Sequence, residues 1–285
     1  MSETNLVNDA KIAFIGAGNM AAAIIAGLVK QGVAPANIEV CAPSEGNRVR
    51  LASEYGVVHS ADNNAAAAKA DILVLAVKPQ MMREVCAQLA EHRNPNSVVL
   101  SVAAGITCQS LANWLATPAQ PAENIAVVRT MPNTPSHIGL GACGLFASSA
   151  VAQTQKDQAQ AIMAAVGLAV WVNSEDEINI VTAVSGSGPA YFFLVFEAMI
   201  DAAEKMGLDR QTAAQLTLQT ALGAAKLAQT SKDDAVTLRK KVTSPNGTTE
   251  RAIASFEQNK LRDTFAAAMQ ACSDRAQQLA TELAK

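Results

Sequence analysis

A glycine-rich turn near the start of the chain constrains the fold more than any other stretch. Residues 12–15 (Ile-Ala-Phe-Ile) are all apolar and predict a short strand that is buried on both faces. Gly16-Ala17-Gly18 follows at once, and a helix rich in small residues is predicted from about Asn19. Such a turn lets backbone N–H groups at a helix N-terminus approach a pyrophosphate closely. Ala21 replaces the usual third glycine and is still small enough for close packing. The stretch therefore predicts a dinucleotide site.

Apolar segments alternate with helical patterns through the first half of the chain. Strands are predicted at 37–42, 71–77, 97–102 and 124–128, and a weaker pair, 144–147 and 169–172, flanks a helix at 153–166. This alternation predicts a parallel, doubly wound sheet of the Rossmann-like α/β class. Ligands of such sheets bind beyond the carboxyl ends of the strands. The loops 16–20, 77–79, 103–105 and 131–135 are therefore expected at one rim.

The second half of the chain has a different character. From Ser174 onward only helical periodicity is found, which divides the chain into an α/β domain (1–173) and an all-helical domain (174–285). Pro189 stands in the first turn of a helix whose residues 190–196 are apolar on every face. A helix that is hydrophobic all round must be buried all round, so a partner subunit is expected to cover it.

Further helices are predicted from the capping residues. Asp209 is expected to cap a helix that runs to about Thr230, and Ser231 a short one after it. Two more helices are predicted from about Glu250 and Leu261.

Composition excludes several classes of function. The chain has 285 residues, of which 50% are hydrophobic and 16% charged, and a net charge of -3, which gives no reason to expect nucleic acid. Its five cysteines are scattered singly, which argues against a metal site or disulfides and favours the reducing cytoplasm. The polar, acidic N-terminus is not typical of a signal peptide. The uncharged stretches 94–122 and 130–155 are broken by Gly, Pro and polar residues, so no membrane span is expected.

The end of the second strand bears on cofactor choice. An acidic residue normally ends this strand in NAD-specific sites, whereas here it runs into Ala42-Pro43-Ser44, with Asn47 and Arg48 close behind. These side chains suit a 2′-phosphate, so NADP is favoured, while Glu45 leaves NAD open. The alternative is that Arg48 belongs to a solvated helix face.

Five motifs in order resemble pyrroline-5-carboxylate reductase, a family that makes proline. They are Gly16-Ala-Gly-Asn-Met20, Ala76-Val-Lys-Pro79, Arg129-Thr-Met-Pro-Asn133, Ser185-Gly-Ser-Gly-Pro-Ala-Tyr191 and Val242-Thr-Ser-Pro-Asn-Gly-Thr-Thr249. The resemblance implies reduction of 1-pyrroline-5-carboxylate to L-proline by NAD(P)H. It also implies a helical C-terminal domain that forms a homodimer, and dimers in this family commonly assemble into decamers.

The resemblance implies a set of site residues. The cofactor would be bound by Gly16, Ala17, Gly18, Asn19, Met20, Ser44, Asn47, Arg48, Asn64, Ala76, Val77, Lys78, Pro79, Ala103, Ala104 and Gly105. The substrate would be bound by Ser244, Gly247, Thr248 and Thr249, and Thr249, Ser244 and Thr182 are the candidate catalytic residues. No metal is implied.

The loop 243–249 leads into a helix, where free N–H groups and hydroxyls form a natural carboxylate cradle. The alternative is that one hydroxyl only caps the helix. Asn246 stands where glycine is common in the family, and asparagine tolerates the left-handed backbone that such a turn needs.

The chemistry that the resemblance implies requires little acid–base machinery. If the imine enters protonated, the site needs mainly to align two reactants. The motif loops contain no His, Asp or Glu suited to proton transfer, and His59, His92 and His137 are interpreted as structural or solvated.

Two alternatives stay open. The β-hydroxyacid dehydrogenases also join a Rossmann domain to a helical one, but they carry a lysine on the first long helix, where this chain has none from Pro189 to Met199. A catalytically idle NADPH-binding regulator would leave the substrate loop unexplained.

Overall fold

The computed structural model describes residues 6–284, which fall into two compact units. Unit 1 consists of two segments, the chain up to Ser187 and the chain from Cys272 onward. Unit 2 is Gly188–Ala271. This division lies later than the predicted boundary at 173/174. The reason is that the buried Arg129 guanidinium binds Glu175 at 3.2 Å and the Asn179 side chain at 3.4 Å, which ties the first helix after the boundary to the sheet.

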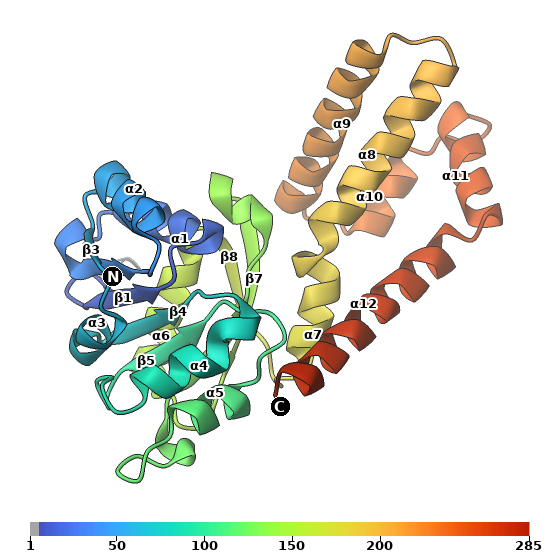
Figure 1. The fold of residues 1–285 in the computed structure, drawn as a ribbon. Coiled ribbons are helices and arrows are strands. Elements are labelled where there is room, and N and C mark those ends of the chain that lie inside the picture. Colours follow the sequence, from blue (N-terminus) through green and yellow to red (C-terminus); the bar gives the residue numbers. More distant parts are fainter. Residues whose placement is uncertain (1–5, 285) are drawn as a thin grey trace. The chain divides into compact units, whose positions relative to one another are not determined.

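Unit 1 is built on one eight-stranded sheet of order β3-β2-β1-β4-β5-β6-β7-β8 (Figure 1). The strands are β1 (Ile12–Ile15), β2 (Ile38–Cys41), β3 (Val58–Ser60), β4 (Ile72–Leu75), β5 (Val98–Ser101), β6 (Val127–Met131), β7 (Gly141–Ala147) and β8 (Gly167–Trp171). The chain winds outward from β1 in both directions, so the predicted doubly wound α/β class is confirmed. The strand order reverses between β1 and β4, which is where such sheets bind nucleotides.

Three details of the sheet differ from the sequence prediction. β3 was not predicted, because it is a short, partly exposed edge strand with little apolar signal. β6 begins at Val127, since residues 122–124 form a 3-10 turn instead. β7 runs antiparallel to β6, because the short connection 132–140 cannot make the crossover that a parallel pair needs.

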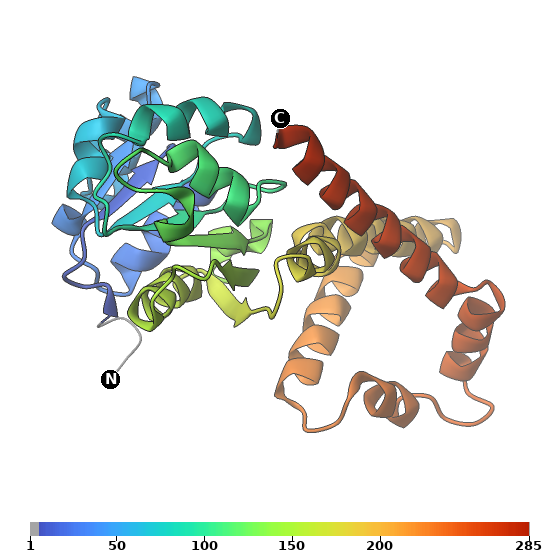
Figure 2. The same ribbon diagram turned by 90° about the horizontal axis from the view of Figure 1, so that it is seen from below.

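Helices cover both faces of the sheet (Figure 2). Successive side chains of a strand point to opposite faces, so Ile12 and Phe14 pack into one core cluster and Ala13 and Ile15 into the other. The first face is covered by α1 (Asn19–Lys30), α2 (Glu45–Tyr55) and α6 (Gln153–Ala164). The second is covered by α3 (Asn63–Lys69), α4 (Pro79–Leu89) and α5 (Cys108–Leu115).

After the sheet the described chain is entirely helical, as predicted. The helices are α7 (Glu177–Val181), a π-helical turn η5 (Thr182–Gly186), α8 (Gly188–Lys205), α9 (Arg210–Thr230), α10 (Ala235–Lys241), α11 (Thr248–Gln258) and α12 (Leu261–Leu283). Asp209 caps α9 by accepting from the Thr212 amide at 2.9 Å. The predicted capping role of Ser231 is wrong: Asp234 caps α10 through the Thr237 amide at 2.7 Å, and Ser231 ends α9.

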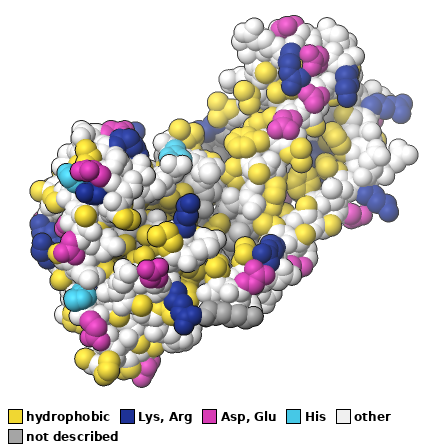
Figure 3. Space-filling view, in the orientation of Figure 1, with side chains coloured by type: hydrophobic (Ala, Val, Ile, Leu, Met, Phe, Trp, Pro, Cys, Tyr) yellow, Lys and Arg dark blue, Asp and Glu magenta, His cyan; other side chains and the backbone are white. Residues whose placement is uncertain are grey.

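Unit 2 lacks an apolar core of its own. Phe192 and Phe193 of α8 are 64% and 57% exposed, and the buried residues of the unit are Gly188, Ala213 and Thr217. Leu216 and Leu222 of α9 are also exposed, and Figure 3 shows a broad hydrophobic surface over these helices. An open helical unit of this kind buries too little apolar surface to be stable alone, so we expect another subunit to cover this surface.

One described helix is long and apolar enough to cross a membrane by length and composition. It is the continuous helical segment from Glu177 to Lys205. Since the apolar surface continues over α9, it fits helix packing between subunits better than a single span.

The apolar surface predicts that assembly is required for stability. Phe193→Glu should abolish the oligomer or prevent folding, because it would bury an unpaired charge. Light scattering and thermal melting measure this outcome, with Gln211→Glu in the exposed first turn of α9 as the control. A wild-type protein that stays folded and active as a monomer on dilution would contradict the expectation.

Candidate functional site

The glycine turn after β1 has the geometry that the sequence predicts. Gly16 has φ +112°, and its N–H donates to the Cys41 carbonyl at 2.7 Å. A Cβ at Gly16 would lie 2.5 Å from the Ala76 carbonyl oxygen, so only glycine lets β1 and β4 meet this closely. α1 then begins at Asn19 after the N-cap residue Gly18, which has no side-chain cap and open space beside it. The helix therefore presents unfilled N–H groups to a ligand.

Two further predicted loops lie beside this turn. β1, β4 and β5 are parallel neighbours, so the residues that follow them share one rim. Residues 76–78 lead from β4 into α4, which begins at Pro79 and also lacks a side-chain cap. Residues 103–105 follow β5, and Gly105 is buried under Leu279 and Leu283 of α12. Unit 1 thus brings together the three cofactor loops that the resemblance implies.

The predicted phosphate-binding residues follow β2. Ser44 is the N-cap residue of α2 without a side-chain cap bond, and Asn47 is exposed on the same helix. The Arg48 guanidinium lies over the strand end, with Nη1 3.3 Å from the Ala42 carbonyl and 3.4 Å from the Pro43 carbonyl. Arg48 is thus held at the rim, unlike Arg50, which pairs with Glu54 at 3.0 Å.

Asn64 lies in the first turn of α3, the helix that packs against β1 and β2. Its backbone N–H donates to the capping Asp62 carboxylate at 3.0 Å, and its side chain is half-buried.

Thr182 is the first residue of the π-helical turn between α7 and α8. Its hydroxyl donates to the Ile178 carbonyl at 2.8 Å, so its lone pairs are left to accept. Sequence reasoning missed the residue that braces this turn: Asn133 Nδ2 donates to the Ser185 carbonyl at 3.0 Å. Pro189 was the signal for such a contact in the sequence. In an α-helix residue 189 would donate to the Ser185 carbonyl, and proline has no N–H with which to do so.

The loop 243–249 belongs to unit 2 and opens α11. Its N-cap residue is Gly247, which has no side-chain cap, so the alternative that a hydroxyl caps this helix is wrong. The hydroxyls of Ser244, Thr248 and Thr249 bond no other described residue. Asn246 has φ +61°, as its left-handed position predicts, and the Glu250 carboxylate accepts its amide at 2.9 Å. The turn is therefore fixed while its hydroxyls stay available.

The histidines and the buried cysteines offer little capacity for acid–base or nucleophilic catalysis. His59, His92 and His137 are all exposed. Burial raises the pKa of Cys41, Cys86, Cys108 and Cys143 to about 12, so these thiols are protonated and inert at neutral pH. No group of metal-ligating side chains occurs among residues 6–284.

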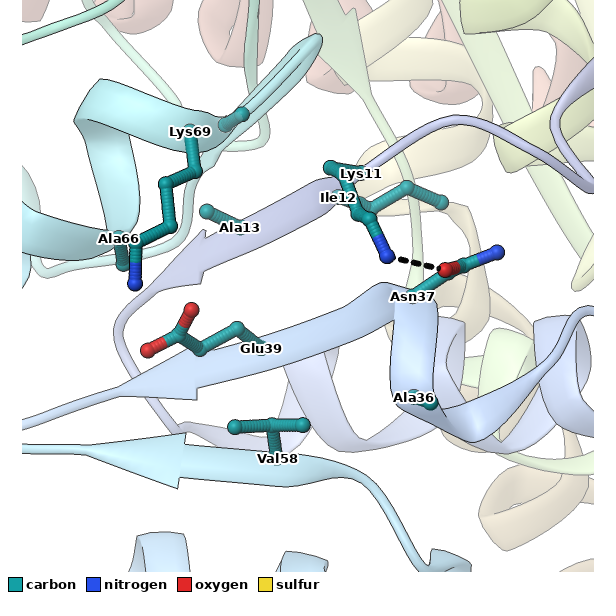
Figure 4. Close-up of a pocket in the computed structure, with 10 residues that line it drawn as sticks. Lys11, Ile12, Ala13, Ala36, Asn37, Glu39, Val58, Ala66 and Lys69 are labelled. Carbon is teal, nitrogen blue, oxygen red and sulfur yellow. Dashed lines mark hydrogen bonds between the residues drawn. The ribbon is translucent and has the colours of Figure 1, made fainter.

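A separate hollow lies at the opposite ends of the strands. Lys11, Asn37, Glu39 and Lys69 line it near the amino ends of β1 and β2. Lys69 and Glu39 point toward one another there, and Lys11 Nζ bonds Asn37 Oδ1 at 2.6 Å (Figure 4). Nucleotides bind at the carboxyl ends of such strands, so this hollow lies away from the rim predicted for the cofactor.

Comparison with known proteins identifies the family. The chain is 50% identical over 273 residues to the pyrroline-5-carboxylate reductase of Pseudomonas aeruginosa, covering 96% of this chain and 98% of that protein. The Haemophilus influenzae enzyme of the same name is 45% identical over 95% of this chain and 97% of its own length. The chain belongs to the pyrroline-5-carboxylate reductase family. Members of this family make proline from pyrroline-5-carboxylate with NAD(P)H.

Family models agree with the two-part organisation. Residues 175–279 match the pyrroline-5-carboxylate reductase dimerisation domain, so the chain forms oligomers through the region whose apolar surface is exposed. Residues 11–105, which hold the glycine turn, match the NADP oxidoreductase, coenzyme F420-dependent domain. The reductase is therefore an NAD(P)H-dependent oxidoreductase with NADP(H) as its cofactor.

Solved structures show the same fold. A pyrroline-5-carboxylate reductase from Coxiella burnetii is similar with a TM-score of 0.90 and 44% identity, over 95% of this chain and 99% of that one. The Plasmodium falciparum pyrroline carboxylate reductase, whose crystal structure has NADP bound, gives a TM-score of 0.82 and 27% identity, over 96% and 99%.

Gly16 and Gly18 predict separable effects of an added methyl group. Gly16→Ala should destabilise the fold by about 1–3 kcal/mol, because its φ and the Ala76 carbonyl both oppose a Cβ. Gly18→Ala should leave the melting temperature nearly unchanged, since its Cβ meets open space, yet weaken NADPH because that space faces the uncapped helix. Melting curves and NADPH fluorescence titrations measure both. Gly18→Ala with wild-type NADPH affinity would place the cofactor elsewhere.

Proposed function

We propose that this reductase converts 1-pyrroline-5-carboxylate to L-proline with NADPH as its preferred hydride donor, using the residues assigned below. One observation carries the proposal: the cofactor-loop and substrate-loop motifs are both present, with Asn246 as the departure noted above, in a chain that is 50% identical to a relative over 96% of its length. The reaction would be the last step of proline biosynthesis.

The rim of unit 1 fits a dinucleotide. The uncapped N-terminus of α1 is suited to the pyrophosphate, and the loops 76–79 and 103–105, with Asn64, would line the rest of the cofactor. When bound, the dihydronicotinamide supplies the hydride for the imine carbon. The contribution of the protein is to bind and orient it.

The end of β2 favours NADPH over NADH. Ser44, Asn47 and Arg48 would hold the 2′-phosphate, because they offer a hydroxyl, an amide and a guanidinium where an NAD-specific site places a carboxylate. Glu45 is the only acidic residue in the first turn of α2 and is exposed, which leaves NADH as a second, weaker donor.

The N-terminus of α11 would bind the substrate carboxylate. Its first amides lack intrahelical acceptors, and Ser244, Thr248 and Thr249 present unbonded hydroxyls beside them. Gly247 supports the approach of a ligand because it adds no side chain at the N-cap. The result is a cradle of donors for an anion.

The Thr182 hydroxyl can accept a hydrogen bond, whereas the groups at the N-terminus of α11 donate. Because its proton is held by the Ile178 carbonyl, the hydroxyl oxygen would accept a hydrogen bond from the protonated ring nitrogen. A substrate that enters as the iminium already carries the proton that proline needs on nitrogen. Alignment of donor and acceptor then supplies the rate acceleration, and no general acid is required.

The remaining proposals concern assembly and location. The dimerisation domain supports a homodimer, and we propose that dimers associate further into a decamer, as is common in the family. The buried free cysteines suit a reducing compartment, so we propose that the enzyme works in the cytoplasm. Analytical ultracentrifugation measures the subunit number.

A spectrophotometric assay tests the reaction directly. The purified protein should oxidise NADPH when pyrroline-5-carboxylate is added, and not when a 3-oxoacid or a semialdehyde is added. Oxidation with the 3-oxoacid alone would instead favour a β-hydroxyacid dehydrogenase. Cofactor binding without turnover would indicate a regulator.

The position of Arg48 predicts that its guanidinium is the source of the preference for NADPH over NADH. Arg48→Ala should weaken NADPH binding by ~1–2 kcal/mol and leave NADH nearly unchanged, because one charge-assisted contact to the phosphate is lost. Arg50→Ala is the matched control, since Arg50 lies on the same helix but pairs with Glu54. Titration of both cofactors measures the effect, and equal losses for NADPH and NADH would contradict it.

Removal of the Thr249 hydroxyl should impair the reaction with pyrroline-5-carboxylate and leave cofactor binding unchanged. Thr249→Val keeps the side-chain shape and removes the hydroxyl, so kcat/KM for pyrroline-5-carboxylate should fall by roughly 10- to 150-fold, as for a lost bond to a charged group. The melting temperature and NADPH affinity should hold, because Gly247 and not Thr249 is the N-cap. Thr230→Val, at the exposed end of α9, is the control. A lower melting temperature with normal turnover would show a purely structural hydroxyl.

A further inference from the structure

The helical segment that follows the sheet contains one turn of unusual register. Between α7 and α8 the Ser187 amide donates to the Thr182 carbonyl at 2.8 Å, five residues back, so the turn Thr182–Gly186 is π-helical. Such turns are rare, and they occur frequently at functional sites. This one begins at Thr182, the residue proposed to face the ring nitrogen.

Pro189 leaves a carbonyl of this turn without its ordinary donor. In a regular α-helix the Ser185 carbonyl would accept from the amide of residue 189, and proline has no N–H. A half-buried carbonyl without a partner is costly, so a donor from outside the helix stabilises the turn.

Asn133 supplies that donor. The residue is only 8% exposed, and Nδ2 lies 3.0 Å from the Ser185 carbonyl. Its Oδ1 accepts the Ala142 amide at 2.9 Å, which fixes the orientation of the side-chain amide. The strand end also packs on the turn, since a Cβ at Gly186 would lie 2.6 Å from Met131 Cε. The end of β6 and the loop after it therefore hold the turn through apolar and polar contacts, respectively.

We propose that Asn133 is a positioning residue, which holds the π-helical turn in register and thereby sets the place of the Thr182 hydroxyl. Without this donor the Ser185 carbonyl would lose its bond, the turn would loosen, and the Thr182 hydroxyl would no longer be held in one place. The inference rests on the proposed role of Thr182 at the ring nitrogen.

Asn133→Asp tests the donor with little change in shape. The carboxylate keeps an acceptor for the Ala142 amide and places an oxygen against the Ser185 carbonyl. We expect KM for pyrroline-5-carboxylate to rise and kcat/KM to fall about tenfold or more, with NADPH affinity unchanged. The defect should shrink as pH is lowered, because a protonated carboxyl can donate to the carbonyl again, and burial raises the pKa at which this occurs.

Asn94→Asp is the matched control. The Asn94 side chain also donates to a backbone carbonyl, that of Ala70 at 3.1 Å, and accepts a backbone amide, that of Asn96 at 3.0 Å. It lies before β5, at the opposite ends of the strands from the rim. The same substitution should lower the melting temperature there without changing KM.

Two further measurements separate this inference from the proposed function. The rate of amide hydrogen exchange at Ser187 measures how often the bond to the Thr182 carbonyl opens, and it needs no substrate. This rate should be faster in Asn133→Asp than in the wild type. In a Thr182→Val background, Asn133→Asp should add little to the KM defect if it acts through Thr182.

Protected exchange at Ser187, or normal kcat/KM despite fast exchange, would overturn the positioning role. Additive KM defects in the double variant would overturn it as well. A wild-type protein that fails to reduce pyrroline-5-carboxylate would refute the proposed function instead, and the exchange experiment would still decide whether Asn133 holds the turn.

Discussion

The close approach of Gly16 to the Ala76 carbonyl is the contact on which the arrangement of unit 1 depends. It lets β1 and β4 pair at the point where the strand order reverses, with the Ala76 amide bonded to the Ile15 carbonyl at 2.8 Å. Because β4 and β5 continue in parallel register, the loops of three strands then face the same rim. The rim proposed for the cofactor is therefore a consequence of sheet topology and one backbone conformation, and few side chains need to be specified to build it.

Local signals in the sequence predict this rim well. β1 and the start of α1 fall where the apolar run and the glycines place them, and the left-handed Asn246 follows from turn chemistry. Contacts between distant residues were not predictable in the same way. The salt bridge between Arg129 and Glu175 joins β6 to the segment before α7, and no periodicity marks such a pair. Because of this salt bridge, the residues just after 173 belong to unit 1.

The two units differ in how their apolar residues are used. In unit 1 alternate residues of each strand fill cores on both faces, whereas α8 and α9 leave large apolar side chains exposed. The sequence analysis expects a partner subunit to cover residues 190–196, because they have no polar face. The match to a dimerisation domain explains why these apolar side chains are exposed in the single chain. Their exposure to water is unfavourable in an isolated chain, and their burial between subunits favours association.

The proposed roles of the hydroxyl groups match the two charges of an iminium carboxylate. Such a substrate carries a cation on nitrogen and an anion on its carboxylate, so it needs an acceptor for one and donors for the other. The back-bonded Thr182 hydroxyl can only accept, while the unbonded hydroxyls at α11 are free to donate. In this proposal each hydroxyl accepts or donates according to whether its own proton is already bonded. Neither the nitrogen nor the carboxylate of the substrate would then need a group that titrates near neutral pH. A reductase of this design can keep its histidines at the surface and its thiols protonated in the core.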